Sequence, residues 1–142
     1  MIKKTGVILA VIFLLTSINS CYFDRNINDE LEICYLNTAN QYLCTIDIDG
    51  SNKKLLIPNP DINHPSWSPD GEQIIFRLGN AIFNIYIVNA DGTNLRKITN
   101  STNATVGNHF PTWSSDGERI IYTEDRDGTR FRHIAKPDGT IL

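Results

Sequence analysis

Apolar and polar residues alternate along short segments of this chain, and Asp, Asn and Gly separate one segment from the next. Residues 72–78 and 84–89 are rich in Ile, Phe, Tyr and Val, a composition typical of β-strands. Shorter segments at 65–68 and 95–99 flank them, which predicts a unit of four strands. Asp-Gly pairs recur between segments and supply the positive φ angles that tight turns need. No helical period appears after the N-terminal segment, so the pattern predicts an all-β fold.

The sequence of this four-stranded unit is repeated along the chain. NHPSWSPDGEQIIF at residues 63–76 returns as NHFPTWSSDGERIIY at 108–122, with one residue inserted before the proline. IYIVNADGTNLRKIT at 85–99 resembles LCTIDIDGSNKKLLI at 43–57 and, more weakly, HIAKPDGTIL at 133–142. A period of roughly 40–47 residues indicates a β-propeller built from four-stranded blades.

Three blades are predicted, at about residues 31–60, 61–107 and 108–142. The first lacks a recognisable innermost strand, and the third ends where its fourth strand begins. Closed propellers use about four to eight blades. We therefore expect an incomplete propeller whose two outer blade faces are uncovered, and we expect self-association as a consequence.

The N-terminal 20 residues have the layout of a signal peptide. Lys3 and Lys4 precede an apolar run at residues 7–15, which is too short for a membrane helix of about 20 residues. Residues 18–21, Ile-Asn-Ser-Cys, resemble the lipobox of bacterial lipoproteins, which implies acylation of Cys21 and a lipid anchor in the cell envelope. Tyr22 after the cysteine favours the outer membrane by the same resemblance. The alternative is an ordinary secretory signal. Residues 21–30 are interpreted as a tether or an extra edge strand.

The charge of the mature chain limits the classes of partner that we expect. Without residues 1–20 the chain carries 11 Lys and Arg against 16 Asp and Glu and no basic cluster, so nucleic acid is not an expected partner.

Cys34 and Cys44 flank a polar loop at residues 38–41 in a predicted hairpin. Export through an oxidising compartment predicts a disulfide between them. The alternative is that both are small core residues.

The repeated motifs resemble those of the TolB-type propeller family, which is related to WD-repeat propellers. The matching residues are Pro65, Trp67, Ser68, Pro69, Asp70, Gly71 and Phe76 in one unit, Pro111, Trp113, Ser114, Asp116, Gly117 and Tyr122 in the next, and Ile85, Tyr86, Asp91, Gly92, Ile98 and Thr99 between them. This resemblance implies the fold. Such propellers serve as binding platforms, scaffolds and accessory domains of peptidases, so it does not settle the function.

Candidate chemistry is sparse. Trp67 and Trp113 recur at equivalent positions and are predicted to be core between blades. His64 and His109 also look equivalent, which would hold them well apart in adjacent blades and argues against a metal pair. The aspartate-rich turns lack the spacing of a calcium loop, and there is no nucleophile elbow or phosphate-binding glycine loop. We expect no catalytic, cofactor or metal site.

These observations favour a non-enzymatic, lipid-anchored envelope protein that binds another protein through its propeller surface, in the periplasm or at the cell surface. The alternatives are an accessory propeller of a prolyl-oligopeptidase-like peptidase and a truncated remnant of a longer propeller.

Overall fold

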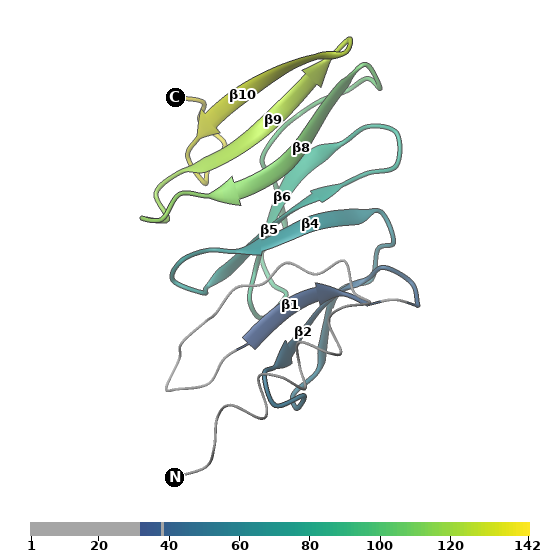
Figure 1. Ribbon diagram of the computed structural model, residues 1–142, viewed down its shortest axis with the longest axis vertical. Coiled ribbons are helices and arrows are strands. Elements are labelled where there is room, and N and C mark those ends of the chain that lie inside the picture. Colours follow the sequence, from purple (N-terminus) through teal and green to yellow (C-terminus); the bar gives the residue numbers. More distant parts are fainter. Residues whose placement is uncertain (1–31, 38) are drawn as a thin grey trace.

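The chain folds as three antiparallel β-sheets stacked one on the next (Figure 1). The computed structural model describes residues 32–37 and 39–142, so the predicted signal peptide, Cys21 and the tether lie outside the described residues. Within the described part there is no helix long and apolar enough to cross a membrane. The predicted fold class, an all-β incomplete propeller, is confirmed.

Each sheet corresponds to one repeat of the sequence and is called a blade. Blade 1 contains β1 (Glu32–Leu36), β2 (Leu43–Asp47) and β3 (Lys54–Ile57). Blade 2 contains β4 (Ile62–Trp67), β5 (Gln73–Leu78), β6 (Asn84–Asn89) and β7 (Arg96–Lys97). Blade 3 contains β8 (Val106–Trp113), β9 (Ile120–Arg126) and β10 (Thr129–Ala135). An isolated bridge between Ala135 and Ile141 follows β10, where the fourth strand of blade 3 would pair.

The recurrent Asp-Gly pairs form the turns between neighbouring strands. At the turn after β6, the Asp91 carboxylate accepts hydrogen bonds from the Thr93 backbone N–H at 2.8 Å and from the Thr93 hydroxyl at 2.6 Å. These hydrogen bonds stabilise the ionised form and lower the pKa of Asp91. Gly92 takes a φ of +87°, a left-handed conformation that glycine adopts without a steric penalty.

Two apolar cores form where the blades meet. The first junction, between blades 1 and 2, buries residues from both sheets: Cys34, Leu36, Leu43, Ile57, Ile62, Trp67, Ile74, Phe76 and Val88. The second junction, between blades 2 and 3, buries a smaller set: Ile75, Ile85, Ile87, Ile120, Tyr122 and Ala135, with Trp113 packed against them. Successive residues of a strand point to opposite faces, so Ile74 serves the first junction and Ile75 the second.

The two tryptophans hold equivalent places but have different hydrogen-bonding environments. Trp67 is 2% exposed in the first junction, and its indole N–H is buried with no hydrogen-bond partner. The Trp113 indole donates to the Ser66 carbonyl of blade 2 at 3.3 Å. The acceptor for Trp113 is thus supplied by the innermost strand of the preceding blade, and the sheet of blade 1 has no such strand among the described residues.

The predicted disulfide is wrong, because Cys34 and Cys44 are offset by one residue across the β1–β2 pair and are not directly opposite each other. Cys34 and Cys44 are both buried, and no disulfide joins them to each other. Cys34 lies opposite Thr45, and Cys44 lies opposite Tyr35. Directly opposed residues share a face of an antiparallel pair, so the two thiols project from opposite faces of blade 1. The alternative that both fill buried positions agrees with this arrangement.

The alignment of the repeats also needs a correction at the innermost strands. Both β4 and β8 contain a register shift before the proline, between Asn63 and Ser66 and between His109 and Thr112. The residue directly before each proline is left-handed, with φ of 53° at His64 and 52° at Phe110. His64 is therefore the structural equivalent of Phe110, and no residue is inserted at this point. The two histidines that looked equivalent in sequence are not.

Candidate functional site

The most distinctive group of side chains lies at the rim of the second junction. It comprises His64 of β4, Arg77 of β5, Phe83 just before β6, and His109 and Phe110 of β8, and is called the Arg77 cluster. The expectation that His64 and His109 sit well apart is wrong, because both rings contact Phe110. The ring centroids are 4.7 Å apart for His64 and Phe110 and 6.0 Å apart for His109 and Phe110.

The β-bulges of the innermost strands place His64 and Phe110. A left-handed backbone is unfavourable by about 1–2 kcal/mol for a residue with a side chain. The prolines that follow, Pro65 and Pro111, are buried and anchor the strand directly after the bulge. A bulge redirects one side chain relative to the regular alternation of a strand. As a result Phe110, although in a strand that packs between blades, is 53% exposed.

Arg77 is held by a histidine and an aromatic ring. Its Nη1 lies 3.0 Å from His109 Nδ1, and its guanidinium carbon lies 4.4 Å from the centroid of Phe83. A guanidinium can only donate, so His109 accepts through Nδ1 and carries its proton on Nε2. Burial and then the Arg77 charge lower the pKa of His109, and burial lowers the pKa of Arg77. His109 is therefore a neutral acceptor that orients a cation.

Gly107 makes room for the His109 ring. A β-carbon built on Gly107 would lie 2.4 Å from His109 Nε2, closer than any real contact of this kind. The imidazole thus folds back over the backbone of its own strand. A residue with any side chain at position 107 would push the ring away from Arg77.

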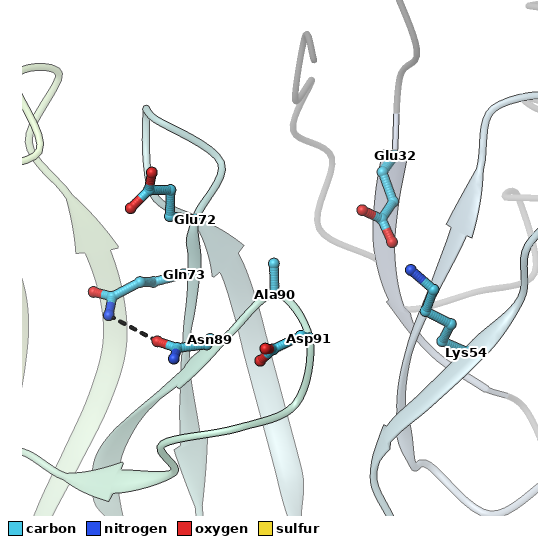
Figure 2. Close-up of a pocket in the computed structure, with 7 residues that line it drawn as sticks. All are labelled: Glu32, Lys54, Glu72, Gln73, Asn89, Ala90 and Asp91. Atoms are coloured by element: carbon cyan, nitrogen blue, oxygen red, sulfur yellow. Dashed lines mark hydrogen bonds between the residues drawn. The ribbon is translucent and has the colours of Figure 1, made fainter. Parts of the chain in front are cut away.

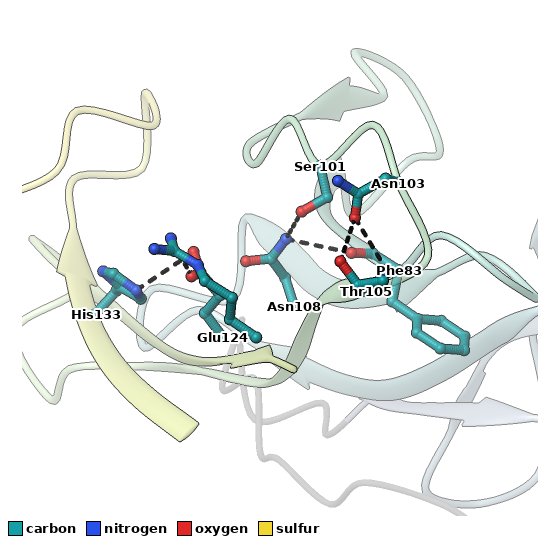
Figure 3. A network of polar contacts seen from close by, with 8 residues as sticks. Phe83, Ser101, Asn103, Thr105, Asn108, Glu124 and His133 are labelled. Atoms are coloured by element: carbon teal, nitrogen blue, oxygen red, sulfur yellow. Dashed lines mark hydrogen bonds and ion pairs between the residues drawn. The ribbon is translucent and has the colours of Figure 1, made fainter. Parts of the chain in front are cut away.

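A polar network behind the cluster holds Phe83 and β8 together (Figure 3). The Asn108 backbone N–H and side-chain amide both donate to the Phe83 carbonyl, at 3.0 and 3.2 Å. The same amide donates to the Ser101 hydroxyl at 2.7 Å. Asn84, which is also buried, accepts from the Ser101 backbone N–H at 2.8 Å and donates to the Ser101 carbonyl. The connection from blade 2 to blade 3 is thereby fixed next to the cluster.

A second polar group in Figure 3 lies on the blade 3 side of the same junction. Glu124 lies 2.6 Å from the Arg126 guanidinium and 3.5 Å from His133 Nε2. The His133 ring stacks on Tyr122 at 5.2 Å. Burial and then the Glu124 charge raise the pKa of Tyr122. Glu124 already has a cationic partner, so this group is a self-contained ion pair at the rim of the core.

A cleft of about 380 Å³ opens between blades 1 and 2 (Figure 2). Its lining combines three carboxylates, Glu32, Glu72 and Asp91, with the single ammonium group of Lys54. The remaining lining residues are Gln73, Asn89 and Ala90, and the Gln73 amide donates to the Asn89 side-chain oxygen at 3.1 Å. In the described part of the chain, no three His, Cys, Asp or Glu side chains are grouped as a metal site would need.

The sequence indicated some of the cluster but not its composition. His64 and His109 were noticed, and Pro65 and Pro111 were assigned to the repeat. Arg77 was missed, although it interrupts the apolar run QIIFRL on the face that otherwise packs between blades. Phe110 was missed because it was interpreted as an inserted residue. An arginine at an apolar face position and an aromatic residue before a strand proline are the signals that could have found them.

Comparisons with known proteins support the TolB-like repeat. No family model matches the chain. The Tol-Pal system protein TolB of Orientia tsutsugamushi (strain Ikeda) is 34% identical over 67 residues, covering 42% of this chain and 15% of that protein. TolB from Acinetobacter baumannii superposes with a TM-score of 0.66 at 18% identity, over 98% of this chain and 35% of that one. The putative TolB from Agrobacterium tumefaciens gives 0.64 at 21% identity, over 80% and 44%.

The same fold occurs in proteins of other activity. A puromycin-hydrolysing peptidase of Mycobacterium tuberculosis superposes with a TM-score of 0.64 at 13% identity, over 84% of this chain and 22% of that one. Likeness at this level shows the fold and does not transfer an activity. The chain spans less than half the length of each of these proteins. What the residues, the sheets and the comparisons together identify is a partial β-propeller similar to that of TolB.

Proposed function

We propose that this protein is a non-enzymatic binding module of the cell envelope, which recognises another protein through the Arg77 cluster. The observation that carries the proposal is the presentation of Phe110, 53% exposed and held by a strand bulge beside Arg77. Aromatic and arginine side chains dominate the binding energy of protein interfaces. Side chains fixed before binding lose less conformational entropy on association.

The envelope location is part of the proposal and rests on residues 1–21. Acylation of Cys21 would anchor the protein, since several acyl chains hold a protein on a membrane far better than a single chain. Labelling with radioactive palmitate in the native host tests this point, with Cys21→Ala as the matched variant. Equal labelling of the two proteins would exclude the anchor.

Site-specific photocrosslinking tests the binding role. A photoreactive amino acid replaces Phe110 in one variant and Leu95 in another, and both are expressed in the native host. Leu95 is a suitable control because it is 46% exposed but lies beside the outermost strand of blade 2, away from the cluster. We expect a discrete protein adduct from position 110 and none from position 95. Adducts from both positions, or from neither, would contradict the proposal.

The accessory-propeller alternative is supported by the fold shared with the puromycin-hydrolysing peptidase. It makes a different prediction for the same experiment. The protein crosslinked at position 110 would then be a hydrolase, and the purified pair would cleave peptide substrates. A partner without hydrolase activity favours the non-enzymatic role.

Self-association is a further part of the proposal. The outer face of blade 3 exposes Ile134 (44%), which occupies the position that Ile87 fills, fully buried, in blade 2. Apolar surface of this kind is stabilised by burial against another blade. Light scattering of the mature protein over a concentration series should show a mass that rises with concentration. A single monomeric mass throughout would exclude it.

A further inference from the structure

We infer that the Arg77 cluster binds a carboxylate, and that the partner protein presents an Asp or Glu side chain to the Arg77 guanidinium. This inference rests on the proposed binding function and specifies the chemistry of the partner. It is carried by three features: the unbalanced charge of Arg77, the absence of that charge from the other repeats, and the groups that orient it.

Arg77 is a partly buried cation without a carboxylate partner among the described residues. Its one hydrogen bond goes to a neutral ring nitrogen, and its Nε is buried with no hydrogen-bond partner. A guanidinium has five N–H donors, so three N–H groups of Nη1 and Nη2 remain besides the buried Nε–H and the one directed at His109. A buried charge without a counter-charge is unfavourable, and proteins normally pair such groups. The described part of the chain leaves this pairing to a ligand.

The charge is specific to blade 2. The strand register places Leu36 at the equivalent position of blade 1 and Thr123 at that of blade 3. The uncharged residues at this position in blades 1 and 3 are compatible with the same sheet and the same repeat. Packing of a blade therefore does not need an arginine here, and Arg77 stands on a face whose neighbours Ile75, Ile85 and Ile87 are fully buried isoleucines.

The surroundings fix the guanidinium in one orientation. His109 holds Nη1, Phe83 lies against the guanidinium at 4.4 Å, and Gly107 leaves space for the His109 ring. A planar guanidinium held in this way matches the two oxygens of a carboxylate. Phe110 and His64 lie beside it in edge-to-face contact and form an exposed aromatic rim. The apolar part of a neighbouring residue in the partner can pack on this rim.

A carboxylate fits this site better than a phosphate group. The cluster offers one permanent cation, and its nearest histidine accepts a hydrogen bond from that cation rather than adding a charge. A phosphate group carries about two negative charges and is normally bound by several cationic groups. A single oriented guanidinium corresponds to a single carboxylate.

Two blocked tripeptides test the inference by NMR titration of the full mature chain. The probe is acetyl-Phe-Glu-Phe-amide, and the matched control is acetyl-Phe-Gln-Phe-amide, which has the same shape without the charge. We expect the Glu peptide to bind at least about tenfold tighter than the Gln peptide, a difference of about 1.4 kcal/mol. The histidine ring signals of His109 and His64 should shift with the Glu peptide. Equal binding of the two peptides, or shifts confined to other residues, would overturn the inference.

Two arginine variants provide a second, independent readout. Arg77→Gln should abolish the preference for the Glu peptide. Arg96→Gln is the matched control, because Arg96 also spans blades 2 and 3, with Nη2 3.4 Å from Gln73 Oε1 and from the Pro137 carbonyl. This variant should keep the preference. Retention of the preference in Arg77→Gln would overturn the inference. The wild-type titration decides the question even where a variant fails to fold.

The outcomes also separate this inference from the proposed function. A crosslinked partner at position 110 without a preference for the Glu peptide would overturn the carboxylate site and leave the binding role standing. A clear preference for the Glu peptide without any crosslinked partner would support the carboxylate site and contradict the protein-binding role.

Discussion

The two junctions between blades are built from the same repeat but differ in chemistry. The first junction is apolar throughout its core and buries Trp67 with an unpaired indole N–H. The second has a smaller apolar core, satisfies the indole of Trp113, and is bordered by Arg77, His109 and Glu124. Residues that recur between repeats make the cores. The polar chemistry comes from positions where the repeats differ.

The largest expected effect is at the first junction. Trp67→Ala removes a fully buried indole, so we expect a loss of about 3–5 kcal/mol in the free energy of unfolding. Trp113→Ala should cost less, because Trp113 is only partly buried. Chemical denaturation of both variants measures the difference. Equal losses would show that the two junctions contribute equally to stability.

Loss of the Asn108 side chain should have an intermediate effect. Asn108→Ala removes one of the two donors to the Phe83 carbonyl and the side-chain donor to the Ser101 hydroxyl, which costs about 1–3 kcal/mol. Asn100→Ala is the matched control, since Asn100 lies in the same connection but is exposed. Urea unfolding of the two variants tests this. A control variant as unstable as Asn108→Ala would contradict the role of the network.

The Arg77 cluster predicts a smaller, pH-dependent effect. Burial and then the Arg77 charge lower the pKa of His109 in the folded state below its ordinary value of 6.5, so the unfolded chain binds more protons just below that pH. Stability should be complete above about pH 6.5 and fall as the pH drops toward the folded-state pKa of His109. The groups that act on His109 are Arg77, His64, Asp125 and Arg130.

Thermal unfolding between pH 7.5 and 5 measures this dependence. His109→Gln should flatten the slope of the melting temperature against pH. The aspartates with lowered pKa values, such as Asp91, respond only below about pH 4 and do not interfere. An unchanged slope in His109→Gln would assign the pH dependence to another group.

The smallest effect concerns the thiols and leaves stability unchanged. Cys34 and Cys44 are buried and not joined to each other, and burial raises the pKa of the Cys44 thiol. Both should resist alkylation in the folded protein and react fully in denaturant. Mass spectrometry of Cys21→Ala after each treatment counts the labels. If the denatured chain took up no label in the absence of a reductant, the two cysteines would be joined by a disulfide.

Sequence periodicity predicted the sheets, the turns and the tryptophan positions, because each depends on residues close together in the chain and repeated along it. It failed where one residue decides the outcome. Cys34 and Cys44 are offset by one residue in the pairing of β1 and β2, and this offset places them on opposite faces. A bulge before Pro65 and Pro111 changed which residues correspond, and bulges have no strong compositional signature.

The candidate site was harder to predict than the fold for a related reason. Arg77 and His109 are 32 residues apart and meet only because blades 2 and 3 stack. Nothing in either local segment specifies the partner. The histidines attracted attention as chemistry-bearing residues, whereas Arg77 looked like one more polar residue near the end of a strand.

The left-handed residue before each strand proline belongs to the exposed surface of its blade, whereas the proline after it belongs to the core. His64 and Phe110 share a backbone conformation and little else, and both are exposed while the prolines after them are buried. After duplication of a blade, drift at this one position can change the contact surface without moving the strand register or opening the core. A propeller that grows by duplication therefore acquires one independently adjustable contact point with each new blade.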